Sequence, residues 1–407
     1  MADNRTFVVV GGGLAGAKTV EALREQGFDG AVELYGAEPH LPYERPPLSK
    51  GYLKTGEGLA DAFVHSREWY LQHHVGLHLG TRVTELALLD HEIATDTGER
   101  VRYDRLLIAT GSTPRQLHLP GAELEGVLYL RIIEDSDRLR AAFQPGRRVV
   151  FVGGGWIGLE AASAAVEAGC TVTVLEALEI PLVRVLGPKI APVFADLHRE
   201  KGVDLRTSVE VADLEGEHGQ VRGVRLADGT TLAADTVVVG IGALPNIELA
   251  EFAGLRLDNG IVVDAQGCTS DPDVFAVGDV ANHFLPFLDQ HVRVEHWATA
   301  LNQPAAVAAG MLGKDDVYDE LPYFFTDQYD LGMEYIGYCG PDDEVVVRGD
   351  LASREFLAFW LRDDRVVAGM AVNTWDVIDD IKVVIRSRAT VDRERLADPG
   401  VPLHELA

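Results

Sequence analysis

The sequence predicts an α/β protein with two Rossmann-like domains and a small C-terminal domain of the α+β class. Three observations lead to this prediction: a glycine-rich strand–turn–helix pattern opens the chain, the same pattern recurs after residue 147, and short alternating strands follow residue 321. The chain has 407 residues, too many for one ordinary core. We therefore expect a first Rossmann-like domain (1–112 with 245–318), a second one (113–244) and a C-terminal interface domain (319–407).

Composition and charge restrict the possible functions. The net charge of −28 argues against nucleic acid or an anionic membrane as partner. No apolar run reaches membrane-spanning length, and the N-terminus enters a strand without a signal-peptide pattern, so we expect a cytoplasmic protein. Cys170, Cys268 and Cys339 are odd in number and far apart, which excludes a disulfide scaffold, a C-x-x-C pair and a cysteine-ligated cluster. Any redox chemistry then requires a bound cofactor.

The chain opens with a dinucleotide fingerprint. In "TFVVVGGGLAGAKTVEALREQG" an apolar strand leads into G-x-G-x-x-G and then into a helix that ends at Gly27. Glycines at this spacing permit a tight turn, let a pyrophosphate approach the helix N-terminus, and let the helix pack on the strand. The predicted contacts to this nucleotide are Gly11, Gly13, Leu14, Ala15 and Gly16.

The same pattern occurs a second time. "RRVVFVGGGWIGLEAASAAVEAGCTVTVLE" repeats the strand, the fingerprint, the helix and a second strand, with the closing glycine at the same offset. Two such βαβ modules predict two bound dinucleotides. The contacts predicted for the second are Gly153, Gly155, Ile157 and Gly158.

Acidic residues near the end of each second strand indicate the kind of nucleotide. Glu176 closes "TVTVLE", where a carboxylate accepts the ribose hydroxyls and repels a 2′-phosphate, so NADH is favoured over NADPH. In the first module the equivalent position is Gly36, followed by Ala37 and Glu38, and Glu38 is the candidate ribose ligand. Glu33 lies mid-strand and is more simply an exposed strand residue.

Two nucleotide modules, each interrupted by other material, suggest the architecture of the flavoprotein disulfide reductases, which is that of glutathione reductase. "YDRLLIATGSTPR" and "TVVVGIGALPN" are apolar strands that run into Thr110-Gly111 and Gly242, and we interpret them as the crossings between the FAD and NAD domains. In "TSDPDVFAVGDVAN" Asp279 follows Gly278, where its carboxylate can bind the ribityl hydroxyls of FAD; capping of the following helix is the alternative.

Over essentially its whole length the chain resembles the NADH-dependent, FAD-containing ferredoxin reductases that serve bacterial cytochrome P450 and Rieske oxygenase systems. The apoptosis-inducing factor flavoproteins resemble it more distantly. Besides the two fingerprints, the resemblance lies in "PYERPPLSK", "ATGSTPR", "YLRIIEDSDRL", "GIGALPN", "VFAVGDVAN", "RVEHWATALNQ" and "PYFFTDQYD".

The resemblance assigns the chemistry to Lys50 and Glu160. In disulfide reductases the segment after the first module carries a redox cysteine pair, whereas here it lacks cysteine and offers Pro46, Pro47 and Lys50. The prolines fix the backbone, so that Lys50 is presented rigidly near flavin N5, paired with Glu160. An ammonium there stabilises the anionic reduced ring, and the carboxylate positions the lysine and the nicotinamide. An exposed lysine and a helix-surface glutamate are the alternative.

Other positions match family contacts one at a time. These are Ala15, Arg45, Val83, Arg131, Asp279 and Trp297 for FAD, Glu295 and His296 where the nicotinamide and flavin rings meet, and Arg184 for NAD. Each has a simpler interpretation: Val83 and Trp297 as core residues, Arg131 in an ion pair with a neighbouring acid, and Arg184 in a salt bridge at a helix start.

The sequence departs from the family pattern twice. The family usually has Asp at position 37, and Ala37 therefore weakens the assignment of the FAD ribose ligand. The usual Phe-Trp-Ser/Thr-Asp reads "FFTD" here, so Phe325 stands where a tryptophan is expected near the nicotinamide. A phenylalanine still stacks on a ring but offers no indole hydrogen bond.

The C-terminal domain is predicted from the strands "EYIGYCG", "EVVVRGD", "REFLAFWLRD" and "RVVAGMAVN", followed by a helix from about Trp375 to Ile385. Lys382, Arg386 and Arg388 give it a basic patch that can steer an acidic ferredoxin; cations compensating a helix C-terminus are the alternative.

The predicted reaction passes hydride from NADH to FAD, and then single electrons from the flavin to an iron–sulfur ferredoxin. We expect a monomer or a homodimer. The rivals are an NADH oxidase or peroxidase, a disulfide reductase, and a non-enzymatic NADH sensor with a stable charge-transfer complex. The absence of cysteine after the first fingerprint counts against the peroxidase and the disulfide reductase.

Overall fold

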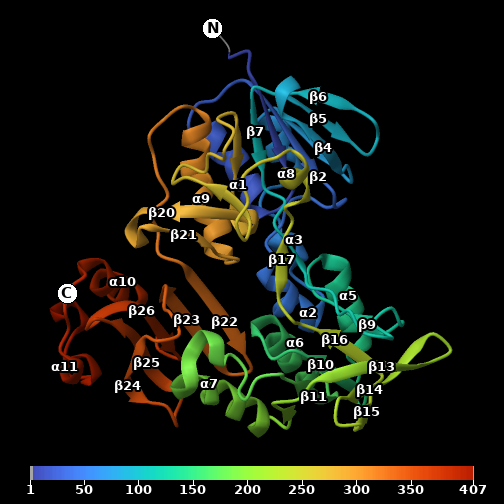
Figure 1. The fold of residues 1–407 in the computed structure, drawn as a ribbon, viewed down its shortest axis with the longest axis vertical. Helices are drawn as coiled ribbons and strands as arrows, with labels where there is room; N and C mark the ends of the chain where they lie inside the picture. The colour runs from blue at the N-terminus through green and yellow to red at the C-terminus, as the bar shows by residue number, and fades with distance from the viewer. Residues whose placement is uncertain (1–2, 407) are drawn as a thin grey trace. The chain divides into compact units, whose positions relative to one another are not determined.

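The computed structural model describes residues 3–406 and divides into two compact units, each treated by itself (Figure 1). The chain passes from one unit to the other after residues 45, 58, 113, 242 and 322. Unit 1 comprises Met1–Arg45, Leu59–Thr113 and Ala243–Pro322; unit 2 comprises Pro46–Gly58, Pro114–Gly242 and Tyr323–Ala407. The division into three domains stays a prediction.

Unit 1 is built on a parallel five-stranded sheet in the order β19-β7-β1-β2-β3. Its strands are β1 (Thr6–Val10), β2 (Ala31–Gly36), β3 (Val75–Leu79), β7 (Arg105–Ile108) and β19 (Val274–Ala276). Phe7 and Val9 of β1 pack against helices α1 (Leu14–Glu25) and α9 (Trp297–Met311), which Figure 1 shows beside the sheet. Val8 and Val10 face a second apolar cluster. A strand covered on both faces reads as the continuous apolar run seen in the sequence.

The second cluster of unit 1 includes a small antiparallel sheet and helix α8 (Glu248–Phe252). That sheet consists of β4 (Val83–Ala87), β5 (Glu92–Thr95) and β6 (Arg100–Arg102). The remaining elements are β18 (Ile261–Val263), β20 (Ala281–Leu285), β21 (Gln290–Arg293), α3 (Leu59–Ala62), α4 (Arg67–Gln72), η2 (Leu88–Asp90), η3 (Gly278–Val280) and η4 (Pro286–Leu288). Strand β8 (Ser112–Pro114) pairs with β17 (Ala243–Pro245) where the chain leaves and re-enters the unit.

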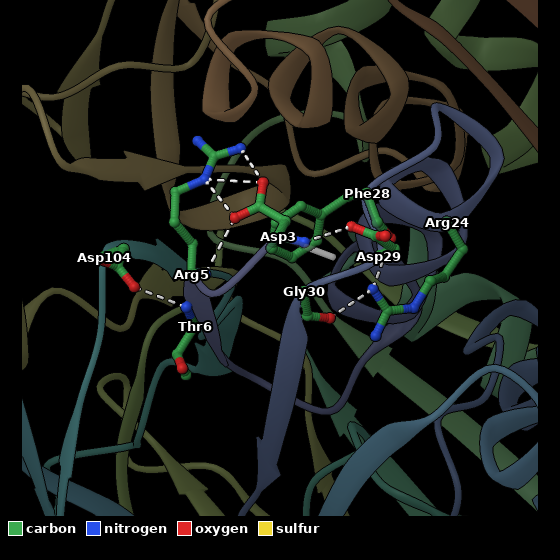
Figure 2. A network of polar contacts seen from close by, with 8 residues as sticks. All are labelled: Asp3, Arg5, Thr6, Arg24, Phe28, Asp29, Gly30 and Asp104. Carbon is green, nitrogen blue, oxygen red and sulfur yellow. Dashed lines mark hydrogen bonds and ion pairs between the residues drawn. The ribbon is translucent and has the colours of Figure 1, made fainter. Parts of the chain in front are cut away.

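A polar network fixes the amino end of the first βαβ module (Figure 2). The Arg24 guanidinium donates to the carbonyl oxygens of Phe28 (2.8 Å) and Gly30 (2.9 Å), which belong to the turn between α1 and β2. The backbone N–H of Thr6 donates to Asp104 Oδ2 at 2.6 Å. These bonds satisfy backbone groups at the turn and hold the start of β1 to the segment before β7. The opposite end of the module, with the fingerprint, is thereby left for ligand binding.

Unit 2 contains the second parallel sheet, in the order β12-β11-β10-β16-β9. Its strands are β9 (Val127–Leu128), β10 (Arg148–Val152), β11 (Thr171–Leu175), β12 (Asp204–Arg206) and β16 (Thr236–Val239). Phe151 of β10 packs with helices α6 (Trp156–Glu167) and α7 (Val183–Glu200). Val150 and Val152 pack instead against an antiparallel sheet. That sheet is β13 (Val211–Glu217), β14 (Gln220–Leu226) and β15 (Thr231–Ala233), and the unit also holds α5 (Ile133–Ala142), η1 (Pro46–Ser49) and α2 (Gly51–Thr55).

The C-terminal part of unit 2 is an antiparallel sheet in the order β22-β23-β26-β25-β24. Its elements are β22 (Tyr323–Gln328), β23 (Leu331–Gly337), β24 (Glu344–Asp350), β25 (Glu355–Arg362), β26 (Arg365–Val372), α10 (Ile378–Ser387), α11 (Arg393–Ala397) and η5 (Leu403–Glu405). The predicted fold class and the four quoted strands are confirmed. The helix expected from Trp375 begins only at Ile378, because Asn373 (φ +47°) and Asp376 (φ +60°) are left-handed and interrupt a helical start.

Within residues 3–406, no helix combines the length and the apolar character that crossing a membrane requires.

Candidate functional site

The fingerprint of unit 1 contains glycines of two kinds. Gly11 has φ +130°, and a Cβ there would lie 2.1 Å from the Ala109 carbonyl oxygen; a Cβ on Gly16 would lie 2.1 Å from the Gly11 carbonyl oxygen. The fold itself therefore requires these two glycines. Gly13 has an ordinary φ of −95°, and a Cβ there would meet no atom within 4 Å. Since packing does not explain Gly13, open space before the first turn of α1 fits an approaching pyrophosphate.

The fingerprint of unit 2 repeats this arrangement. A Cβ on Gly153 (φ +102°) would lie 2.4 Å from the Gly240 carbonyl oxygen, and one on Gly158 would lie 2.6 Å from the Gly153 carbonyl oxygen. Gly155 has φ −77°, and its nearest neighbour to a Cβ would be 3.8 Å away. Ile157, in the first turn of α6, is 49% exposed. Each module thus keeps one glycine, at the N-cap of its helix, that close backbone packing does not require, and its open side leaves room for a ligand at the helix N-terminus.

Glu176 follows β11 and lies against the second fingerprint. Its carboxylate accepts hydrogen bonds from the backbone N–H groups of Gly154 (2.9 Å) and Leu178 (2.8 Å). Backbone donors hold an anionic oxygen pair where the ribose of a bound nucleotide would be. Arg184 lies exposed in the first turn of α7. The preference for NADH stays a prediction, and this geometry favours it.

The displaced acid of the first module has a steric cause. A Cβ on Gly36 would lie 3.3 Å from Gly12 Cα, and one on Gly12 would lie 3.0 Å from Gly36 Cα. The end of β2 and the fingerprint turn therefore pack backbone against backbone, with no room for a side chain. Glu38 as the ribose ligand stays a prediction; its carboxylate accepts hydrogen bonds from Tyr43 Oη (2.5 Å) and Arg45 Nη2 (2.9 Å).

The neighbours of Glu38 lie apart from this cluster. Ala37 is exposed. Glu33 is half-buried in mid-strand and contacts His78 of β3 at 2.7 Å, so it is not the free surface residue expected from the sequence. Its carboxylate is engaged within the sheet rather than at the strand end.

Asp279 lies beside the first fingerprint. Gly278 (φ +74°) would bring a Cβ within 3.0 Å of Ala15 Cβ, and its N–H donates to Gln303 Oε1 of α9 at 2.9 Å. Asp279 belongs to η3, and its carboxylate accepts a hydrogen bond from Ser112 Oγ at 2.9 Å. The backbone of Gly278, next to Asp279, thus packs on the first turn of α1, and the role of Asp279 in ribityl binding stays a prediction.

The two crossing segments that precede Asp279 in the sequence are held together by hydrogen bonds. Thr110 Oγ1 donates to the Asn246 carbonyl oxygen at 2.8 Å, and Asn246 Nδ2 donates to the Thr110 carbonyl oxygen at 2.7 Å. Gly111 belongs to the first crossing segment and has φ +68°. Gly242 begins the second crossing segment and has φ +103°. The two crossings are therefore locked to each other.

The remaining predicted contacts of unit 1 lie on β4 and around the start of α9. Val83 is 6% exposed and belongs to the core, which agrees with its simpler interpretation as a core residue. Trp297 Nε1 donates to Glu44 Oε2 at 2.9 Å, and Glu295 pairs with Arg293. Burial lowers the pKa of His296 to about 4, so its ring is neutral at pH 7.

Arg131 belongs to unit 2, just before α5. Its backbone N–H donates to Asp135 Oδ2 at 2.9 Å, and the Asp135 carboxylate also pairs with Arg138.

Lys50 and Glu160 lie together in unit 2. Lys50 Nζ is 2.7 Å from Glu160 Oε1, and its side chain is 19% exposed. Glu160 is only 2% exposed, although it lies on α6. Two hydroxyls also donate to its carboxylate: Ser49 Oγ at 2.6 Å and Thr326 Oγ1 at 2.5 Å. One cation and two hydroxyl donors thus satisfy the hydrogen-bonding capacity of this buried carboxylate and fix its position.

Sequence reasoning did not identify Ser49 or Thr326 as partners of Glu160. Ser49 directly precedes Lys50, and Thr326 directly follows Phe325, whose ring centre is 5.2 Å from Lys50 Nζ. Their proximity in sequence to predicted residues was the available signal.

Comparisons with known proteins extend over the whole chain. A family model described as pyridine nucleotide-disulphide oxidoreductase matches residues 5–304, and one described as reductase C-terminal matches residues 323–407. The ferredoxin–NAD(+) reductase component of an anthranilate 1,2-dioxygenase system from Burkholderia cepacia is 43% identical over 399 residues, 98% of each chain.

Putidaredoxin reductase from Pseudomonas putida is 38% identical over 412 residues, covering 100% of this chain and 97% of that protein. The crystal structure of a covalent putidaredoxin reductase–putidaredoxin complex superposes with a TM-score of 0.96 at 37% identity, covering 99% of this chain and 98% of that chain.

Proposed function

Because the chain belongs to the pyridine nucleotide-disulphide oxidoreductase family, we propose that it passes electrons from NADH through FAD to an iron–sulfur ferredoxin. The observation that supports the proposal is the pair of fingerprints, each with open space beside the glycine at the helix N-terminus. The segment Pro46–Gly58 contains Lys50 and no cysteine, which disfavours a disulfide substrate. The inference that a ferredoxin is the electron acceptor rests on full-length relatives that are named as ferredoxin–NAD(+) reductases.

FAD, when bound, supplies a ring that takes up a hydride and gives out single electrons. The residues suited to hold it are the first fingerprint for the pyrophosphate, Glu38 for the adenosine ribose, and Asp279 for the ribityl chain. Gly155 and Glu176 are suited to the pyrophosphate and ribose of NADH.

Lys50 keeps a positive charge next to the buried carboxylate of Glu160, which fixes the position of the ammonium. A fixed cation favours an electron-rich ring without reorganisation at the moment of transfer. Glu160 is held in turn by Ser49 and Thr326, so the pair is pre-organised.

For the ferredoxin we propose the basic side chains of α10 and its C-terminus as the docking surface. Lys382, Arg386 and Arg388 stand out in a chain of net charge −28, and a local positive field raises the association rate of an acidic partner. Docking there predicts that association slows as the salt concentration rises.

The test is anaerobic stopped-flow absorbance of the purified protein with NADH or NADPH, followed by an oxidised ferredoxin. We expect fast flavin bleaching with NADH, a weak response to NADPH, and fast reoxidation by ferredoxin. A long-lived charge-transfer band that ferredoxin does not discharge would instead identify an NADH sensor.

A further inference from the structure

A continuous chain of polar side chains leads away from Glu160 inside unit 2. Gln328 Nε2 lies 3.2 Å from Thr326 Oγ1, Gln328 Oε1 lies 2.9 Å from His198 Nε2, and His198 Nδ1 lies 3.3 Å from the hydroxyl of Tyr329. Thr326 itself contacts Glu160. Thr326, Gln328 and His198 are at most 1% exposed. Three fully buried polar residues are costly unless each is satisfied, and here every link is made.

Two elements supply this chain. Thr326 and Gln328 alternate on β22 and therefore point to the same side of the strand, while His198 comes from the last turn of α7. Burial lowers the pKa of His198 to about 4, which leaves the ring neutral at pH 7, with one protonated and one bare nitrogen.

Only one arrangement of the hydrogen atoms satisfies all links. An ionised carboxylate only accepts, so the Thr326 hydroxyl donates to Glu160 and must itself accept from the amide N–H of Gln328. The amide oxygen of Gln328 then faces His198, which donates from Nε2. The bare Nδ1 accepts from the hydroxyl of Tyr329. Every donor in the chain is thus directed toward Glu160.

We propose that His198 and Gln328 are positioning residues that direct the Thr326 hydroxyl onto Glu160 and so hold its carboxylate in place beside Lys50. If the ring proton of His198 were on Nδ1, the Gln328 amide would turn over and the Thr326 hydroxyl would donate to it instead. The tautomer of a buried histidine therefore determines a hydrogen bond to Glu160 from two residues away. The proposal rests on the proposed function only in taking Lys50 and Glu160 as the catalytic pair.

The decisive variant is Gln328→Glu, which keeps the shape of the side chain but offers no N–H to Thr326. The introduced carboxylate draws the Thr326 hydroxyl away from Glu160 but also repels Glu160 as a like charge, so the uncharged variant Thr326→Val serves to separate the two effects. We expect the acid limb of the pH profile for flavin reduction by NADH to rise by about one pH unit, since a hydrogen bond to a charged group has about this effect on a pKa. Thr326→Val should give the same shift, and Thr326→Ser should restore the wild-type limb. The dissociation constant of NADH should change less than about twofold, because the ground-state contacts to the nucleotide stay intact.

The matched control is His283→Gln in unit 1. His283 is likewise 2% exposed with a pKa lowered by burial to about 4, but it lies on β20 and outside this chain of residues. Its replacement should lower thermal stability and leave the acid limb in place. If Gln328→Glu lowers stability as the control does but leaves the limb unmoved, the network is only structural and the proposal fails.

A second readout does not depend on electron transfer. In protein labelled with 15N-histidine, the ring signals lost in His198→Gln should show a protonated Nε2 and a bare Nδ1, without titration between pH 5 and 8. A protonated Nδ1, or titration near pH 6.5, would overturn the proposal. If the protein takes no electrons from NADH, the proposed function is refuted. The tautomer measurement would still decide whether His198 has the proposed positioning role.

Discussion

Replacing Gly155 by alanine separates the demands of the fold from those of the ligand. At φ −77° and ψ 175° alanine is unstrained, and its Cβ would have no neighbour closer than 3.8 Å. Alanine restricts the unfolded chain, a gain of about 0.4–1 kcal/mol, but it is a poorer N-cap of α6 than glycine by a similar amount, so the free energy of unfolding should change by less than about 1 kcal/mol. For NADH, the added methyl occupies space that the pyrophosphate needs in order to reach the helix N-terminus. Losing two charge-assisted hydrogen bonds costs about 3 kcal/mol, which weakens NADH binding about 100-fold.

Gly153→Ala provides the contrast within the same turn. Its Cβ would lie 2.4 Å from the Gly240 carbonyl oxygen at φ +102°, so we expect a loss of more than about 2 kcal/mol of stability. Thermal unfolding measures the change in stability, and calorimetric titration with NADH measures the change in affinity. The flavin absorbance of both variants is recorded as well. If Gly155→Ala binds NADH like the wild type, or unfolds like Gly153→Ala, the reasoning from the open space is refuted.

Three further changes have defined outcomes. Glu176→Gln should reduce the preference for NADH over NADPH about 10-fold in kcat/KM, because it removes about 1.4 kcal/mol of repulsion with a 2′-phosphate. An unchanged ratio of the two kcat/KM values would exclude Glu176 as the residue that selects NADH. Asp235 pairs with Arg148 at 2.6 Å, and this hydrogen bond lowers its pKa from 3.8 to about 2. Because the pKa is depressed by folding, the stabilisation is complete above pH 4 and is lost as the pH falls through 2. Asp235→Asn should therefore cost about 1–2 kcal/mol at pH 7 and less than about 0.5 kcal/mol at pH 2 in chemical denaturation. Phe325→Leu removes a ring 5.2 Å from the Lys50 ammonium and should slow flavin reduction by NADH two- to fivefold, since such a contact contributes about 0.5–1 kcal/mol; a 100-fold loss in stopped-flow would require a different role.

The two modules and the C-terminal strands were predictable because their signals are local. A fingerprint, a strand and a helix lie within thirty residues, and the glycine spacing reports backbone geometry directly. Glu176 was found for the same reason. By contrast, the shift of the acid in the first module to Glu38 was visible in the sequence, but its cause, the close packing of Gly12 on Gly36, appears only in the structure.

The surroundings of Glu160 could not be predicted because they are assembled from distant segments. Ser49 lies 111 residues away from Glu160 in the chain and Thr326 lies 166 away, while His198 and Gln328 are 130 apart. No periodicity links such positions. The pairing of Lys50 with Glu160 itself came from resemblance, and no spacing in this sequence points to it.

The interleaving of the two units has a consequence for synthesis of the protein. Strand β7 lies between β1 and β19, and Leu106 is opposite Val274, about 170 residues later. At ribosomal rates of 5–20 residues per second, the apolar edge of β7 waits roughly 10 to 30 seconds for its partner. During that time the second module emerges with strands that could pair wrongly with an open edge. The parallel sheet of unit 1 therefore cannot be completed early, and chaperones should bind this chain at the β7 edge until residue 276 has left the ribosome.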